Sequence, residues 1–165
     1  MSNNRLMTGL GVAALGVVFA TGAQAQLLAH KDLSLAQALT IATVGHDLCK
    51  SQGYTVSVTV VGRNGEIIVQ LRGDNAPPHT AENSFKKAYS SRTYRVPSGE
   101  LVKRLKDNPT APFVHLSNVV AAQGALPIKV GEETIGAVGI SGAPGGEKDE
   151  ICAKAGIDKV IDTLK

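Results

Sequence analysis

The chain has 165 residues, of which 43% are hydrophobic and 19% are charged, and its formal net charge is +3. This length suits one domain with a sizeable hydrophobic core. The small net charge, together with the lack of a basic stripe interleaved with aromatic residues, argues against nucleic acid as a partner.

The first 25 residues have the pattern of a secretory signal peptide. A single cation, Arg5, precedes an uncharged apolar run, and the segment ends in Ala23-Gln24-Ala25, a small-x-small cleavage pattern. A membrane anchor is the alternative, but glycines interrupt the run and no stop-transfer pattern follows it. We therefore expect residues 26–165 to form a single periplasmic or secreted domain with no membrane segment after cleavage.

The first half of this domain predicts a helix followed by a hairpin. A helix is expected over residues 35–52, because Ser34 is a good N-cap, apolar residues recur at helical spacing, and Gly53 stops the pattern. The strands "TVSVTVV" and "IIVQL" flank an Asn64-Gly65 turn, which is the clearest hairpin signal in the chain. The following "RGDNAPPHT" is expected to be a loop, since its two prolines cannot continue a strand.

The second half predicts helices, a weak strand and another hairpin. Helices are expected over residues 81–94, capped by Thr80, and over residues 99–106. A weak strand over residues 118–123 precedes a hairpin made of "ALPIKV" and "TIGAVGIS", and a closing helix runs from residue 147 to 164. This order of elements predicts an α+β domain with helices packed on an antiparallel sheet.

Two cysteines, Cys49 and Cys152, are too far apart in sequence for a CxxC motif or a zinc pattern. In an oxidising compartment an even number suggests one disulfide, while two buried thiols are the alternative. A bridge requires the first and last helices to share a face of the sheet, with the two Cα atoms within about 7 Å.

The stretch "TIGAVGISGAPGGEKDE" places several glycines before a helix, as phosphate-binding loops do. However, its spacing is Gly136-x-x-Gly139-x-x-Gly142 rather than G-x-G-x-x-G, only one helix follows it, and no G-K-[ST] is present. A nucleotide site is therefore not expected. The first two of these glycines fall inside the predicted strand, where glycine usually marks the close approach of another element.

The same stretch resembles the C-terminal signature of the GlcG/HbpS-like haem-degrading domain family. The matching positions are Gly124, Pro127, Ile128, Gly136, Gly139, Ser141, Gly142, Asp149 and Glu150, and upstream Arg72, Asp74, Ala76, Lys87 and Ala88 keep further family patterns. Two positions depart from the family: Ala125 replaces a glycine, and Arg63 stands where an aspartate is usual. The resemblance spans almost all of residues 26–165.

The resemblance implies a profilin-like, three-layer α/β/α sandwich on a five-stranded antiparallel sheet, often assembled into homo-oligomers. It also implies binding of haem or another tetrapyrrole, with haem degradation in some members. One branch of the family partners a redox-responsive sensor kinase, and another accompanies glycolate metabolism. The sequence contains no recognisable catalytic motif, so any turnover would depend on the haem iron with a peroxide or a reductant.

His46, in the first predicted helix, and His79, after the double proline, are the candidate ligands of a haem iron. For each, the alternative is a structural or surface histidine. His115, between apolar neighbours, and His30, near the mature N-terminus, are weaker candidates, as are two tyrosines, Tyr89 and Tyr94.

Charged candidates lie in the loop and in the helix that follows it. Arg72 is expected to pair with Asp74 or with a ligand carboxylate such as a haem propionate. Lys87, with Lys86 and Arg92, could neutralise an anionic ligand, although such a stripe is more often a solvated face. Two other functions stay open: an accessory domain that binds a small organic acid, and an oligomeric interaction module without a ligand.

Overall fold

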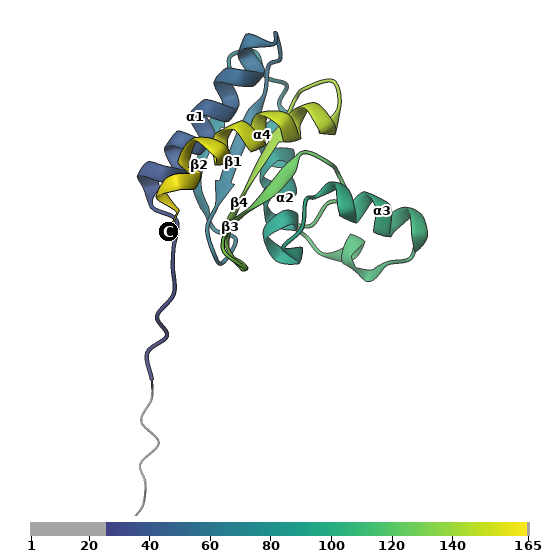
Figure 1. Ribbon diagram of the computed structural model, residues 1–165. Helices are drawn as coiled ribbons and strands as arrows, with labels where there is room; N and C mark the ends of the chain where they lie inside the picture. Colours follow the sequence, from purple (N-terminus) through teal and green to yellow (C-terminus); the bar gives the residue numbers. More distant parts are fainter. Residues whose placement is uncertain (1–25, 165) are drawn as a thin grey trace, which may run out of the picture.

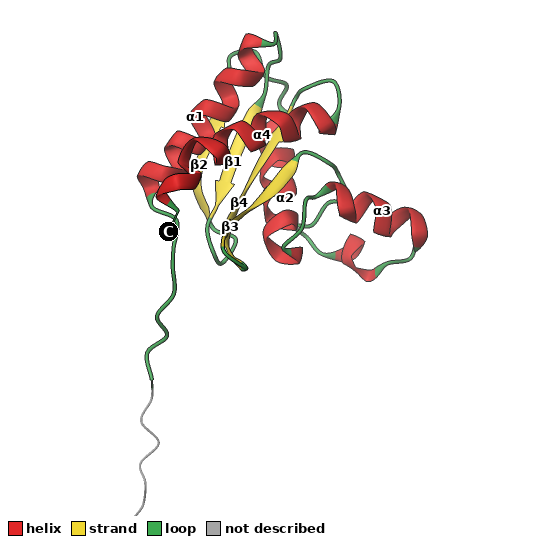
Figure 2. Cartoon of the chain, viewed as in Figure 1, coloured by secondary structure: helices red, strands yellow, loops and turns green. Residues whose placement is uncertain are grey.

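The structure, a computed structural model, describes residues 26–164, so the predicted signal peptide lies outside the described residues. The elements follow one another as α1 (Leu35–Ser51), β1 (Ser57–Val61), β2 (Ile67–Arg72), α2 (His79–Tyr94), α3 (Gly99–Asp107), η1 (Pro112–His115), β3 (Ala125–Val130), β4 (Glu133–Ser141), α4 (Gly146–Val160) and η2 (Ile161–Thr163). Figure 1 shows their arrangement and Figure 2 shows the same view by element type. The predicted α+β class is confirmed.

The sheet is antiparallel throughout, with strand order β2-β1-β4-β3. Both predicted hairpins are present, and they meet at the centre of the sheet, where Val60 of β1 pairs with Val138 of β4. Helices α1 and α4 lie together on one face of the sheet, and α2 covers the other (Figure 1). The molecule therefore has three layers, as the resemblance implies.

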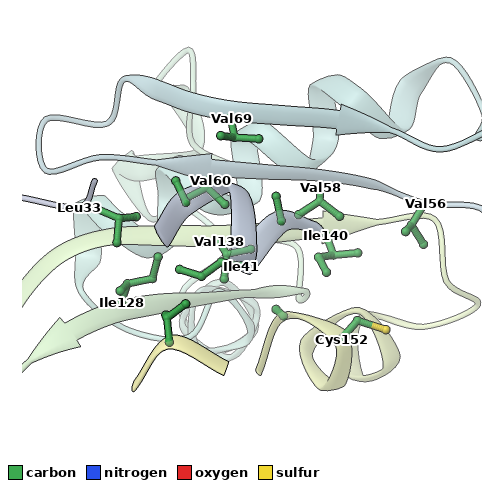
Figure 3. Close-up of a cluster of buried hydrophobic side chains, with 14 of the residues drawn as sticks. Leu33, Ile41, Val56, Val58, Val60, Val69, Ile128, Val138, Ile140 and Cys152 are labelled. Carbon is green, nitrogen blue, oxygen red and sulfur yellow. The ribbon is translucent and has the colours of Figure 1, made fainter. Parts of the chain in front are cut away.

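The layer between the sheet and the α1–α4 pair is apolar. Val58 and Val60 of β1 and Ile140 of β4 are fully buried there against Ile41 of α1 (Figure 3). Side chains alternate along a strand, so the neighbouring positions of β1 point to the other face of the sheet. The main hydrophobic core consequently lies on one side of the sheet only.

The layer between the sheet and α2 is thin and polar. Thr59 and Ser84 share a hydrogen bond of 2.7 Å between their hydroxyl oxygens, and both residues are fully buried. Gly139 faces the same layer, and a Cβ atom there would lie 2.7 Å from the backbone nitrogen of Ala88, which is closer than real contacts allow. The prediction that this strand glycine marks a close approach is confirmed, because α2 packs directly on the backbone of β4.

The sheet has four strands in the described residues, so the expected fifth strand over residues 118–123 is wrong. The backbone nitrogen of Val120 donates to the hydroxyl of Ser90 at 2.8 Å, not to a neighbouring strand. The side chain of Val119 packs with Leu101 in a small separate core under α3. The segment is apolar because it covers this small core, which is why it resembles a strand in sequence.

Two helix boundaries differ from the predicted ones by more than one residue. Helix α2 begins at His79, and Thr80 lies inside it, where its hydroxyl donates to the carbonyl of Pro77 at 2.7 Å instead of capping the helix. The closing helix ends as α4 at Val160 and continues as the short η2. Among the helices described for residues 26–164, none is both long enough and apolar enough to cross a membrane.

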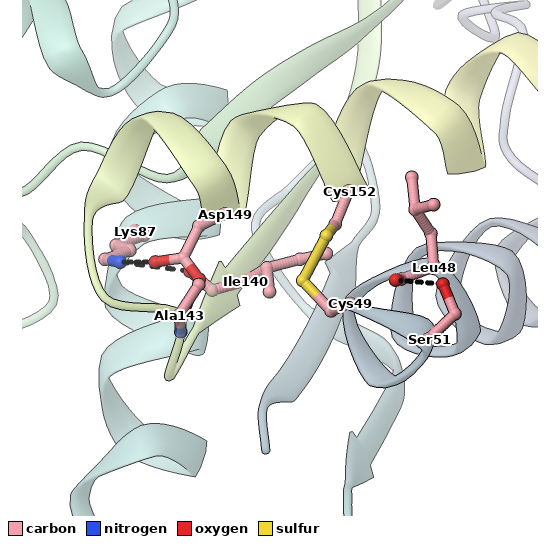
Figure 4. Close-up of a disulfide and its surroundings, with 8 residues drawn as sticks. All are labelled: Leu48, Cys49, Ser51, Lys87, Ile140, Ala143, Asp149 and Cys152. Carbon is pink, nitrogen blue, oxygen red and sulfur yellow. Dashed lines mark hydrogen bonds and ion pairs between the residues drawn. A yellow bond between two sulfur atoms is a disulfide. The ribbon is translucent and has the colours of Figure 1, made fainter. Parts of the chain in front are cut away.

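A disulfide joins Cys49 of α1 to Cys152 of α4, with the two Cα atoms 5.7 Å apart (Figure 4). Both cysteines are fully buried. The two helices share a face of the sheet, which is the condition that the bridge requires. The disulfide is thus the correct one of the two alternatives, and it fixes α1 against the last helix of the fold.

Candidate functional site

The residues of the candidate site gather where the end of β2 passes beside α1. His46 lies on α1 with a side chain that is 20% exposed. It lines a pocket of about 280 Å³ together with Gln70, Leu71, Arg72, Gly73 and Asp74. The structure therefore brings three of the predicted site residues, His46, Arg72 and Asp74, to one pocket.

The two ring nitrogens of His46 have different surroundings. Its Nδ1 lies 3.0 Å from the Oδ1 atom of Asp47, and no described residue forms a hydrogen bond with Nε2. A carboxylate can only accept, so Nδ1 carries the proton and Nε2 keeps a free lone pair when the ring is neutral. A neutral histidine in this state is suited to bind a metal through Nε2.

Gly73 lies against this free nitrogen. A Cβ atom at position 73 would be 2.8 Å from Nε2 of His46 and 2.9 Å from the carbonyl oxygen of Val56. The backbone nitrogen of Gly73 also donates to that carbonyl, at 2.9 Å, which fixes the loop beside the strand. Glycine thus allows the loop to approach His46 without a side chain filling the space next to Nε2.

Arg72 does not pair with Asp74, so that part of the prediction is wrong. One guanidinium nitrogen of Arg72 donates to the backbone carbonyl of Ala76 at 2.5 Å, and the described residues contain no ion pair between Arg72 and Asp74. The bond to Ala76 orients the side chain along the loop. Arg72 remains exposed at the rim of the pocket, where its other donors are available to a carboxylate.

His79 occupies a different pocket. It is exposed at the start of α2, in a hollow of about 290 Å³ lined also by Glu82, Asn83, Lys86 and Val120. Because α2 and α1 cover opposite faces of the sheet, the structure does not bring His79 and His46 together in one chain. The carboxylate of Glu82 lies 2.6 Å from the ammonium of Lys86, which reduces the capacity of that lysine to neutralise a ligand.

Lys87 points into the protein. Its Nζ atom lies 2.8 Å from Oδ2 of Asp149 and donates to the carbonyl of Ile140 at 3.0 Å (Figure 4). The other carboxylate oxygen accepts from the backbone nitrogen of Ala143 at 3.1 Å. The lysine is 5% exposed and Asp149 is 2% exposed. The charge of Lys87 is therefore already matched, and the structure does not support the prediction that it binds a ligand.

Burial raises the pKa of Asp149, although the charge of Lys87 and the hydrogen bond from Ala143 lower it in part. Gly124 lies against this ion pair, since a Cβ atom there would be 2.6 Å from Nζ of Lys87. Its φ of +131° also favours glycine. Three positions that match the family pattern thus form one structural unit, which connects α2 to the start of α4: Gly124, Lys87 and Asp149.

The weaker candidates do not gather at one site. His115 is exposed on η1, so the expected apolar setting is wrong, and His30 is exposed beside Asp32 at 3.3 Å. The Tyr94 ring packs edge-on against Phe113 in the small core under α3. Over residues 26–164, no group of three or more histidine, cysteine and acidic side chains is arranged to hold a metal ion.

Sequence reasoning missed Asp47 as a partner of His46. The two residues are neighbours on a helix, and neighbouring side chains usually diverge, so their spacing gave no reason to connect them. It also missed the ion pair between Lys87 and Asp149, which joins residues 62 positions apart. Only the resemblance, which includes both of these positions, carried a signal for that pair.

Comparison with known proteins identifies the family. The family described as "Haem degrading protein HbpS-like" matches residues 33–158. The chain belongs to this family. Protein GlcG of Escherichia coli K12 is 28% identical over 109 residues, which are 66% of this chain and 81% of GlcG.

Two solved structures share the fold of this chain. The crystal structure of HbpS is 33% identical, with a TM-score of 0.76 over 87% of this chain and 99% of HbpS. The crystal structure of a PduOC–haem complex is 24% identical, with a TM-score of 0.69 over 76% of this chain and 93% of PduOC. At this identity the likeness to PduOC establishes the shared fold alone. The predicted family and its antiparallel α+β architecture are confirmed.

Proposed function

We propose that this HbpS-like protein binds haem, or a closely related tetrapyrrole, through Nε2 of His46. The observation that carries the proposal is the state of this imidazole, which lines a pocket: Nδ1 contacts Asp47, and Nε2 has no hydrogen-bond partner within residues 26–164. A neutral imidazole nitrogen is a common axial ligand of haem iron. The family is described as haem degrading, and PduOC, which has the same fold, was solved with haem.

The residues fit an axial ligand but do not enclose a whole haem. The pocket of about 280 Å³ lies below the range of roughly 300–1,000 Å³ of sites that bury a ligand. It can admit one part of a flat macrocycle, while the remainder must lie outside the pocket. We therefore place the ligand between α1, the loop over residues 72–80 and a neighbouring protomer, in a homo-oligomer.

Arg72 has the chemistry to bind a carboxylate of this ligand. In the described part of the chain, the carbonyl of Ala76 is the only hydrogen-bond partner of the Arg72 guanidinium, and the residue is exposed at the rim of the pocket. A guanidinium offers five donors and forms strong bidentate bonds with carboxylates. In this proposal His46 binds the iron, Arg72 binds a propionate, and the bound haem supplies any redox chemistry.

We further propose that the protein is exported, acts outside the cytoplasm, and has a sensor kinase and further copies of this chain as partners. The signal-peptide pattern of residues 1–25 supports export, and the disulfide between Cys49 and Cys152 suits an oxidising compartment. Fusion of residues 1–30 to a reporter that is active only after export would test this proposal. Reporter activity outside the cytoplasm would support export, and an inactive reporter retained in the cytoplasm would contradict it.

Hemin titration of the protein in residues 26–165 tests the main proposal. We expect a saturable change in the Soret absorption at about one hemin for each site. A linear, non-saturable response would contradict specific binding. The second candidate, binding of a small organic acid at Arg72, predicts thermal stabilisation by glycolate or a related acid without a response to hemin, and Arg72→Ala should abolish it.

A further inference from the structure

We infer that Asp47 is a positioning residue that sets which nitrogen of His46 is free and how strongly that nitrogen donates electrons. This inference deepens the proposed function. Its claim about electron donation rests on that function, because it applies only if His46 binds the haem iron. The contact is direct, with Nδ1 and Oδ1 3.0 Å apart.

The two ends of the imidazole lie in different surroundings. The Nδ1 end meets the carboxylate of Asp47, whose side chain is 65% exposed, while the Nε2 end faces the backbone of Gly73. An isolated neutral imidazole can carry its proton on either nitrogen. The acceptor at Nδ1 therefore selects the form in which Nε2 has the lone pair. It selects this form before any ligand binds.

The negative charge of Asp47 has a second effect. A carboxylate that accepts from a metal-binding histidine increases the electron donation of the other nitrogen and fixes the orientation of the ring. Loss of such a partner typically lowers metal affinity by about 10- to 100-fold. Stronger donation favours the higher oxidation state of a bound metal, so Asp47 should stabilise the ferric over the ferrous form of a bound haem.

The first test uses the protein without any ligand. Nitrogen-15 NMR of the histidine rings should show His46 with its proton on Nδ1 in the wild type and in Asp47→Asn, which keeps an oxygen acceptor. In Asp47→Ala the proton should shift in part to Nε2. An unchanged tautomer in Asp47→Ala would overturn the inference, whatever the protein binds.

The second test uses hemin. Asp47→Ala should weaken hemin binding by about 10- to 100-fold and raise the reduction potential of the bound haem, and Asp47→Asn should restore most of the affinity but not the potential. Asp158→Asn removes an equal charge from the exposed face of α4 and is the matched control. Equal effects of Asp158→Asn and Asp47→Asn would show a general charge effect and contradict a direct role. If the wild type does not bind hemin, the proposed function fails, while the tautomer measurement still decides this inference.

Discussion

The ammonium of Lys87 and the carboxylate of Asp149 form a fully enclosed ion pair, 2.8 Å apart, between α2 and the first turn of α4. The carbonyl of Ile140 and the backbone nitrogen of Ala143 satisfy the remaining polar atoms of the pair. Because α2 covers one face of the sheet and α4 the other, this pair connects the two outer layers around the end of β4. It is a structural feature, and it lies apart from the pocket of His46.

Removal of one partner should strongly destabilise the fold. Lys87→Ala or Asp149→Ala leaves an unpaired buried charge, which we expect to lower the free energy of unfolding by about 3–5 kcal/mol. The double variant Lys87→Met/Asp149→Leu removes both charges and should cost much less than the two single changes together. Urea unfolding followed by circular dichroism measures all three.

The exposed ion pair between Lys154 and Asp158, 2.6 Å apart, provides the matched control. Lys154→Ala should change the free energy of unfolding by only about 0–1 kcal/mol, because water already solvates both groups. Equal costs at the buried and the exposed pair would contradict the account of Lys87.

The raised pKa of Asp149 predicts a pH dependence of stability. A folded-state pKa above the unfolded value means that the folded protein binds this proton more tightly. The stability that this group contributes is therefore fully present below the ordinary carboxyl pKa of about 3.9 and is lost as the pH rises through the raised value. Wild type should lose stability relative to Asp149→Asn over that interval. A difference that stays constant or moves in the opposite direction as the pH rises above the ordinary carboxyl pKa would exclude this titration.

The glycine at position 139 should not tolerate a side chain. In Gly139→Ala the new Cβ would overlap the backbone of α2 at Ala88, so either the helix or the strand must move. We expect a cost of about 1–3 kcal/mol from this overpacking, and a larger cost for Gly139→Val. In thermal melts the melting temperature should be highest for the wild type, lower for Gly139→Ala and lowest for Gly139→Val. A melting temperature for Gly139→Ala equal to that of the wild type would show that α2 is not in close contact with β4.

The disulfide should contribute substantially to stability, because it closes a loop with a sequence separation of 103 residues. Cys49→Ala/Cys152→Ala should lower the free energy of unfolding by about 2–4 kcal/mol. The wild type treated with a reductant under unfolding conditions should approach the same value. If the double variant unfolded at the same denaturant concentration as the oxidised wild type, the bridge would not be a stabilising element.

Local sequence patterns predicted most of the fold because they agree with the tertiary structure. The Asn64-Gly65 turn lies between two runs rich in β-branched residues, and both runs contain strands of the observed hairpin. The strand predicted over residues 118–123 is wrong, because an apolar run that covers the small core under α3 has the same local pattern as a strand. The distinction depends on α3 and Ser90, which the local pattern does not contain.

The candidate site was predicted in part, for similar reasons. Residue chemistry pointed to His46 and Arg72, and the fold does bring them to one pocket. Residue chemistry did not reveal that Lys87 points inward, because its partner, Asp149, is distant in sequence. Sequence spacing alone also could not show that α1 and α2 cover opposite faces, which separates His46 from His79.

The central claim, that Nε2 of His46 binds haem iron, is tested most directly by hemin titration of His46→Ala beside His79→Ala. Each change removes one imidazole, half-buried at position 46 and exposed at position 79, so His79→Ala is the matched control. The account predicts that His46→Ala loses the wild-type Soret band and binds hemin at least about 10-fold more weakly, while His79→Ala keeps the wild-type spectrum and affinity. A wild-type spectrum and affinity in His46→Ala would contradict the account.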